Sequence, residues 1–157
     1  MIKRAAVLVL ASLTLAGCAG TATAEPTKTR APVESFIAEG TVSTAPNPSY
    51  FPPGVESHTI GDLCEPTDGY DDVALGSQVI ISDDAGKTVG VGELTAGVLT
   101  GPDDIESILD ATCVFTFRVD VKSTSDFYGV QVGNDERGDV KYKKSDLTAG
   151  VDMTIGL

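Results

Sequence analysis

Alternation of apolar and polar residues, which is typical of strands with one buried and one solvated face, dominates the chain beyond residue 35. The clearest case is "CVFTFRVDV" (113–121), where every second residue from Cys113 to Val121 is apolar, while Arg118 and Asp120 lie on the other face. Further segments with strand composition follow at intervals of roughly ten residues. They are "FIAEGTVST" (36–44), "HTIGDLC" (58–64), "GSQVIISDDAGKTVGVGEL" (76–94), "FYGVQVG" (127–133), "DVKYKK" (139–144) and "GVDMTIGL" (150–157). Short strands at this spacing predict an all-β fold, a small antiparallel β-sandwich of the Ig-like or prealbumin-like kind.

Turn residues divide two of these strand regions into hairpins. "DDAG" (83–86) separates two runs of β-branched residues, and Gly86 can adopt the positive φ that a tight turn needs. Asp83 and Asp84 are therefore expected to have a structural role in this turn. "NDERG" (134–138) is expected to join the strands on either side of it in the same way.

One segment, "GPDDIESILDA" (101–111), has the features of a helix. Pro102 suits a first turn, Asp103 and Asp104 are acidic residues near the N-terminus, and apolar residues follow at helical spacing. We expect one or two helical turns that close an edge of the sandwich.

The N-terminus has the layout of an export signal. Lys3 and Arg4 precede an almost wholly apolar run from Ala5 to Leu15. The run is shorter than the ~20 apolar residues that a membrane-spanning helix needs, and polar residues follow it rather than a stop-transfer pattern. We therefore expect a removable signal and no permanent transmembrane helix.

The sequence Leu15-Ala16-Gly17-Cys18 resembles the lipobox of bacterial lipoproteins. The resemblance implies that the Cys18 thiol receives a diacylglyceryl group, that cleavage follows Gly17, and that acyl chains on Cys18 hold the protein on the extracytoplasmic face of the cell membrane. More than one acyl chain is what stable membrane attachment requires.

Three segments follow from this processing. Residues 1–17 are the signal peptide, which is removed. Residues 18–34 are rich in Ala, Thr and Pro, cannot build a core, and form a lipidated flexible tether. Residues 35–157 form the β-sandwich domain.

The remaining cysteines, Cys64 and Cys113, are expected to form one disulfide, because the protein is bound for an oxidising exterior. A metal site is the weaker alternative, since the sequence has no second pair of Cys or His ligands. A reactive-thiol role is weaker still, because His58 is the only histidine.

The mature part is strongly acidic. Without Lys3 and Arg4 it keeps 9 basic and 23 acidic side chains, a formal charge of −14. Nucleic acids and anionic lipid headgroups both repel such a body. Nucleic-acid binding is therefore excluded, and the acyl chains must hold the protein at a membrane that its net charge disfavours.

Acidic residues near Tyr70 are weak candidates for a Ca²⁺ site. Asp68, Asp71 and Asp72, with Glu65 nearby, could supply oxygen ligands. The segment lacks the D-x-D-x-D-G loop and its closing Glu, so the favoured interpretation is a turn at Gly69 whose carboxylates cap backbone amides.

No catalytic centre is predicted, and no cofactor. Any Ser-His-Asp triad would have to use His58, and the chain contains no G-x-S-x-G motif. "GVGE" (90–93) lies within strand residues and lacks the following helix that a phosphate-binding loop needs. A carboxylate pair for glycoside hydrolysis stays open, although the chain has no Trp for sugar stacking.

Two resemblances bear on fold and location. The run from the hairpin 76–94 through 113–121 to 127–133 is similar to prealbumin-like modules of surface proteins, which have an Asp/Gly hairpin before "F-x-F-x-V" and "Y-x-V-x-V" strands. Residues 60–145 also resemble a family of small actinobacterial lipoproteins, some encoded by temperate phages. The matching positions are Cys64, Gly69-Tyr70-Asp71-Asp72, Gly76, Gln78-Val79, Asp83, Gly86-Lys87, Cys113, Phe115, Phe117, Val119, Phe127-Tyr128, Val130, Val132, Gly138, Val140 and Tyr142. This second resemblance implies a lipid-anchored surface protein and carries no assigned activity.

Three hypotheses about function follow. The first is a non-enzymatic, lipid-anchored binding or display module whose partner the sequence does not identify; a protein of the cell envelope or of a phage is the candidate. The second, from the phage members of the resembling family, is a surface protein that excludes a superinfecting phage and has a phage protein as partner. The third is an extracellular Ca²⁺-binding or hydrolytic protein. The oligomeric state is left open.

Overall fold

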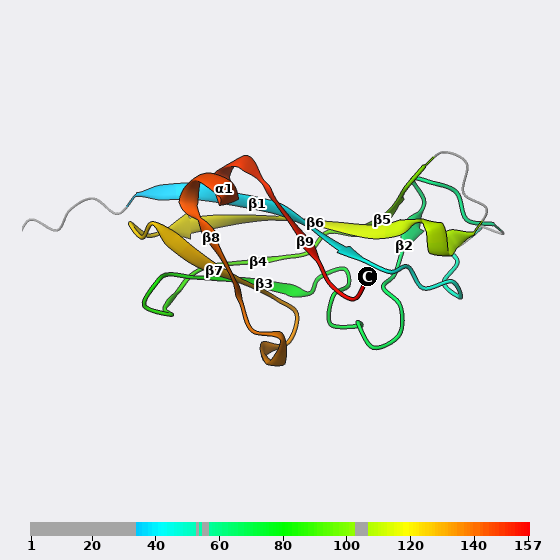
Figure 1. The fold of residues 1–157 in the computed structure, drawn as a ribbon, viewed down its shortest axis with the longest axis horizontal. Coiled ribbons are helices and arrows are strands. Elements are labelled where there is room, and N and C mark those ends of the chain that lie inside the picture. The colour runs from blue at the N-terminus through cyan, green and yellow to red at the C-terminus, as the bar shows by residue number, and fades with distance from the viewer. Residues whose placement is uncertain (1–33, 53, 55–56, 103–106) are drawn as a thin grey trace, which may run out of the picture. The chain divides into compact units, whose positions relative to one another are not determined.

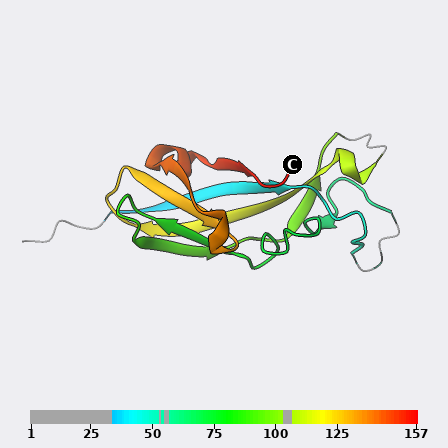
Figure 2. The same ribbon diagram turned by 60° about the horizontal axis from the view of Figure 1, so that its bottom comes forward.

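The computed structural model describes residues 34–52, 54, 57–102 and 107–157, and these form two β-sheets packed face to face (Figures 1 and 2). One sheet has the strand order β2-β5-β6-β1-β9 and the other β4-β3-β7-β8. The bounds are β1 Ser35–Thr44, β2 Leu63–Cys64, β3 Gln78–Ser82, β4 Thr88–Glu93, β5 Gly97–Thr100, β6 Thr112–Lys122, β7 Phe127–Val132, β8 Val140–Lys143, α1 Lys144–Ala149 and β9 Val151–Thr154. The predicted all-β sandwich is confirmed.

The long strands β1 and β6 are inner strands of the first sheet. They pair antiparallel over the whole length of β1, from Ser35 opposite Lys122 to Thr44 opposite Cys113. The alternation predicted for 113–121 is confirmed, because every second side chain from Cys113 to Val121 is buried in the core. Burying a Val or Phe side chain contributes about 1.5–3 kcal/mol, so this one face is a major part of the core.

The hairpin predicted at 76–94 is confirmed as β3 and β4. Its turn places Gly86 at a φ of 76°, and the Asp83 carboxylate accepts hydrogen bonds from the backbone N–H groups of Ala85 (3.0 Å) and Lys87 (2.9 Å). The structural role expected for Asp83 is thereby explained: it satisfies turn amides that no strand partner reaches.

One side of the sandwich is closed by β4, which lies directly against β6. A Cβ atom at Gly92 would lie 2.7 Å from a methyl group of Val119, and one at Gly90 would lie 2.9 Å from another. Glycine at both positions lets the two strands approach this closely. The chain then crosses to the other sheet, where the Thr95 N–H donates to the Thr116 carbonyl at 2.9 Å.

The opposite side has the remaining edge strands, β8 in one sheet and β9 in the other, joined in sequence by α1. The strand predicted at 150–157 is confirmed, but β9 runs parallel to β1, with Gly40 opposite Val151, whereas an antiparallel arrangement was expected throughout. The short helix α1 makes the parallel pairing possible, because it reverses the chain after β8.

The helix predictions need correction. The sequence predicts one or two helical turns at 101–111, and the described residues there form a single 3₁₀ turn, Ile108–Asp110, capped by Ser107, in place of an α-helix. The predicted start, with Asp103 and Asp104, lies outside the described residues. The described residues contain an α-helix, α1, that was not predicted; its single buried residue, Leu147, belongs to the core, and Gly150 is its C-cap.

Candidate functional site

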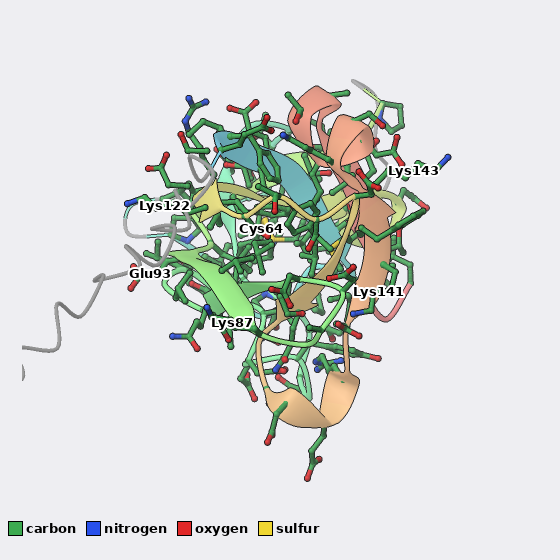
Figure 3. All side chains as sticks on the ribbon, turned by 90° about the vertical axis from the view of Figure 1, so that its left-hand side faces the viewer. Cys64, Lys87, Glu93, Lys122, Lys141 and Lys143 are labelled. Carbon is green, nitrogen blue, oxygen red and sulfur yellow. A yellow bond between two sulfur atoms is a disulfide. The ribbon has the colours of Figure 1, made fainter. Side chains whose placement is uncertain are left out.

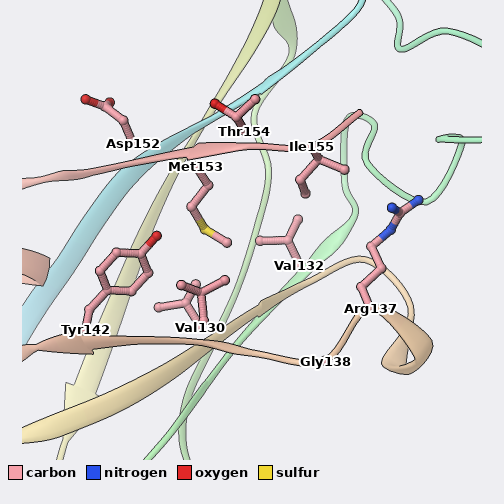
Figure 4. Close-up of a pocket in the computed structure, with 10 residues that line it drawn as sticks. Val130, Val132, Arg137, Gly138, Tyr142, Asp152, Met153, Thr154 and Ile155 are labelled. Carbon is pink, nitrogen blue, oxygen red and sulfur yellow. The ribbon is translucent and has the colours of Figure 1, made fainter. Parts of the chain in front are cut away.

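The candidate site is a cleft of about 510 Å³ on the side of the sandwich where β8 and β9 are the edge strands (Figure 4). We call it the edge cleft. It is lined by Val130, Val132, Arg137, Gly138, Val140, Tyr142, Asp152, Met153, Thr154 and Ile155. These residues come from β7, β8 and β9 and from the segments that follow β7 and β9. The cleft therefore exists because β8 and β9, which follow one another in sequence, belong to different sheets and form the free edges on the same side of the sandwich.

The floor of the edge cleft is apolar. Val130 and Val132 of β7 and Met153 of β9 point into it and belong to the buried core, while Ile155 is partly buried beside them. A ligand that covered this floor would remove apolar surface from water, which is favourable by about 25 cal/mol per Å².

Polar groups stand at the rim. Tyr142 of β8 reaches across the cleft toward β9, where Asp152 and Thr154 are exposed (Figure 4). Partial burial raises the pKa of the Tyr142 hydroxyl, and the nearby Asp152 carboxylate raises it further. The hydroxyl consequently stays protonated near neutral pH and can act as a hydrogen-bond donor at the rim.

Arg137 is the basic residue of the cleft and is held in place from outside it. Its Nε and Nη2 groups donate to the two carboxylate oxygens of Asp72 at 2.7 and 2.6 Å, and its guanidinium lies 5.0 Å from the ring centroid of Tyr70. These hydrogen bonds, with one from the Asn134 N–H (3.1 Å), lower the pKa of Asp72 to about 2, against the opposing effect of its partial burial. A bidentate pair of this kind fixes the orientation of the guanidinium.

The acidic residues proposed as a weak Ca²⁺ site bind different partners in the structure. Asp72 binds Arg137, and Asp68 accepts a long hydrogen bond (3.5 Å) from the side chain of Asn47. Within the residues that the structure describes, no three His, Cys, Asp or Glu side chains are placed to hold a metal ion together. Gly69 has a φ of 89°, which fits the turn that was the favoured interpretation.

His58 stacks on the ring of Phe51, with centroids 4.3 Å apart. Neither of its ring nitrogens has a hydrogen-bond partner among the described residues, so these residues supply no carboxylate or hydroxyl partner of the kind a catalytic triad uses.

The predicted disulfide between Cys64 and Cys113 is present, with the two Cα atoms 5.9 Å apart and both residues buried. It joins β2 to β6. In the first sheet β2 is the edge strand opposite β9, and neither cysteine lines the edge cleft.

The lipidation site Cys18, the signal 1–17 and, apart from Glu34, the tether 18–34 lie outside the described residues. Among the helices that are described, none has the length and hydropathy that a membrane crossing would require.

The edge cleft itself was not predicted from the sequence. Its residues are spread over 130–155 and carry no motif, and their only local signal is that "DVKYKK" and "GVDMTIGL" are short strands, as edge strands often are.

Comparison with known proteins adds no relative: no family model, no curated protein and no solved structure matches this chain. The resemblances to actinobacterial lipoproteins and to prealbumin-like modules therefore stay predictions from the sequence.

Proposed function

We propose that this protein is a non-enzymatic binding module, anchored to the outer face of the cell membrane by acyl chains on Cys18, that binds an extended segment of an envelope protein in the edge cleft. The observation that carries the proposal is an apolar-floored cleft bounded by two edge strands. The anchor is supported by the lipobox-like sequence ending at Cys18 and by the composition of the tether. The tether segment ends directly before β1, which begins at Ser35.

Edge strands favour a polypeptide as the ligand. The Ile155 N–H donates to the Ser43 carbonyl of β1 at 2.9 Å. Because successive N–H groups of a strand point to opposite sides, those of Asp152 and Thr154 point away from β1. A bound segment in extended conformation could accept these hydrogen bonds while alternate side chains cover the apolar floor, as in β-strand addition. The volume of the cleft lies in the range of about 300–1,000 Å³ that ligand sites usually have.

Rim charges would fix the direction of the bound segment. Arg137 stands at one part of the rim and Asp152 at another, so a segment with an acidic and a basic side chain could pair with both. Opposite charges at the rim favour one orientation over its reverse and add more to specificity than to affinity.

The test compares two valines on the two edges of the same sheet. Val140 lines the edge cleft on β8 and is 49% exposed; Val91 lies on β4, at the other edge, and is 54% exposed. Val140→Glu should abolish capture of a partner from cell-envelope extract, because it places a charge over the apolar floor. Val91→Glu should retain capture, since it adds the same charge outside the cleft.

Hydrogen exchange on the recovered complex locates the bound segment. Slower exchange at the amides of Asp152 and Thr154 would support strand addition at β9. Equal capture by Val140→Glu and the unchanged protein would overturn the cleft as the binding site. Retention of a small amphipathic molecule in place of a protein, seen by native mass spectrometry, would overturn the polypeptide as ligand.

A further inference from the structure

A second surface lies at the end of the sandwich where β1 begins, which we call the tether end. Four parts of the chain meet there through hydrogen bonds. The Ser123 N–H donates to the Glu34 carbonyl (3.2 Å), the Ser125 hydroxyl donates to Asp84 of the β3–β4 turn (3.0 Å), and the Lys144 N–H donates to the Asp126 carbonyl (3.0 Å). The tether end is therefore one continuous surface, and the chain leads from it toward Cys18.

Charge is distributed unevenly between the two ends. Lys87, Lys122 and Lys143 are exposed around the tether end (Figure 3). The described loops of the opposite end come from segments 44–77 and 93–112, which contain no Lys or Arg, and from the β7–β8 turn, whose Arg137 pairs with Asp72. The described acidic residues of segments 44–77 and 93–112 are Asp62, Glu65, Asp68, Asp71, Asp72, Glu93 and Asp110. An anionic surface would repel the opposite end much more strongly than the tether end.

The three lysines form no ion pairs with other residues that the structure describes. None of the salt bridges among the described residues includes Lys87, Lys122 or Lys143. Lys144 differs, because it pairs with Glu34 at 2.7 Å and lies 5.3 Å from the ring centroid of Phe36. Four acidic residues also lie at this end: Glu34 pairs with Lys144, Asp83 accepts turn amides, Asp84 accepts the Ser125 hydroxyl, and Asp126 is exposed beside Phe127. The tether end is therefore close to neutral, whereas the opposite end is strongly acidic.

An exposed aromatic ring lies beside the lysines. Phe127, the first residue of β7, is 49% exposed and pairs with Lys143 on β8. Asp126, Phe127, Lys143, Lys144 and Ser145 line one shallow hollow. An aromatic ring flanked by lysines is a common arrangement where proteins contact the interfacial region of a bilayer.

We propose that the tether end, through Phe127, Lys122, Lys143 and Lys87, contacts the anionic headgroups of the membrane that carries the anchor. The inference rests on the proposed anchoring at Cys18. A tether of this length has a reach on the order of 20 Å, so the tether end stays close to the bilayer while the acidic end points away. The contact orients the body and presents its long sides, including the edge cleft, away from the lipid.

The experiment uses a tryptophan as reporter, because the chain contains none. Phe127→Trp places it at the tether end, and Phe51→Trp, at a residue 46% exposed in the opposite loops, is the matched control. Each variant is exported and reconstituted in vesicles, held by its own acyl chains or, where fatty-acid labelling of Cys18 fails, by a maleimide phospholipid coupled to the Cys18 thiol. The second anchor keeps the test of orientation independent of the test of natural lipidation.

Quenching by brominated lipid is measured in vesicles of phosphatidylcholine and in vesicles of equal parts phosphatidylcholine and phosphatidylglycerol. We expect strong quenching of Phe127→Trp in the anionic vesicles, reduced by added salt, and no quenching of Phe51→Trp. Adding Lys122→Gln and Lys143→Gln should reduce the quenching several-fold, whereas Lys122→Arg and Lys143→Arg should preserve it. Equal quenching at both positions, quenching only of Phe51→Trp, or none at either would overturn the inference.

Discussion

At the scale of single residues, the pair of Asp72 and Arg137 connects the edge cleft to the loop that precedes β3. Asp72 accepts both guanidinium hydrogen bonds and the Asn134 N–H, and Gly133 brings the chain close beside it. The guanidinium of Arg137, a residue that lines the cleft, is thus fixed by a carboxylate outside it. Loss of the carboxylate would release Arg137 and loosen the turn between β7 and β8.

This pair makes stability depend on acid pH. Because the folded state lowers the pKa of Asp72 to about 2 from its ordinary 3.8, its contribution is fully present above about pH 4 and is lost as the pH falls through about 2. Both side chains are partly exposed, at 25% and 22%, so we expect about 1–2 kcal/mol after solvent screening. Asp72→Asn should lower the free energy of unfolding by this amount near pH 6, and the difference from the unchanged protein should vanish near pH 2, as measured by urea unfolding.

The neighbouring Asp71 supplies the control for that measurement. It is exposed and takes part in none of the salt bridges among the described residues. Asp71→Asn should leave the free energy of unfolding almost unchanged at both pH values. If Asp72→Asn and Asp71→Asn behaved alike, the ion pair would have no stabilising role.

At the scale of elements, the disulfide holds the weakest strand of the first sheet. β2 has two residues and pairs only with β5, while Cys64 bonds across to Cys113 on β6. The bond closes a loop with a sequence separation of 49, and that loop contains the β3–β4 hairpin and β5. Its main effect is expected on the unfolded chain, whose freedom it restricts.

Cys64→Ala combined with Cys113→Ala should therefore lower stability by ~2–4 kcal/mol, and the melting temperature by roughly 8–20 °C. The measurement is thermal unfolding of both proteins, with intact mass before and after alkylation to verify the bond in the unchanged one. Reduction of the unchanged protein should reproduce the lower melting temperature. An unaltered melting temperature in both cases would show that the bond does not stabilise the fold.

Elements with a strong local pattern could be predicted, and those set by long-range pairing could not. Residues 113–121 bury one complete face, so alternation located β6, and "DDAG" located the hairpin turn. The helix α1 has a single buried residue, Leu147, which is too little for a periodic signal. The parallel pairing of β1 with β9 places Gly40 opposite Val151, and no local sequence pattern predicts this register.

The candidate site was beyond prediction for the same reason. Val132, Tyr142 and Met153 meet in the edge cleft only after both sheets have formed and their free edges face one another. Alternation indicates that a side chain is buried, and it does not indicate which strands end a sheet. The acidic segment near Tyr70 drew attention as a metal site, whereas the structure uses its Asp72 to position Arg137.

At the scale of the whole molecule, the two proposed surfaces depend on one anchor point. The chain has three cysteines, and the bond between Cys64 and Cys113 leaves Cys18 as the remaining thiol. A thioether to diacylglyceryl needs such a thiol, and it needs it next to the signal-peptide boundary. With the anchor at Cys18, the acyl chains offset the repulsion between the acidic body and an anionic membrane.

Cys18→Ser should abolish acylation, because a hydroxyl cannot replace the thiol in the thioether, and the precursor should keep residues 1–17 because lipoprotein cleavage follows lipid transfer. The measurement is metabolic labelling with a fatty-acid probe, together with intact mass of the membrane and medium fractions. Ala19→Ser, which places the same side chain one position later, should retain both label and cleavage. Labelling that persists in Cys18→Ser would contradict the anchor at Cys18, whereas the orientation imposed by the tether end is tested separately, with the protein coupled to a maleimide phospholipid.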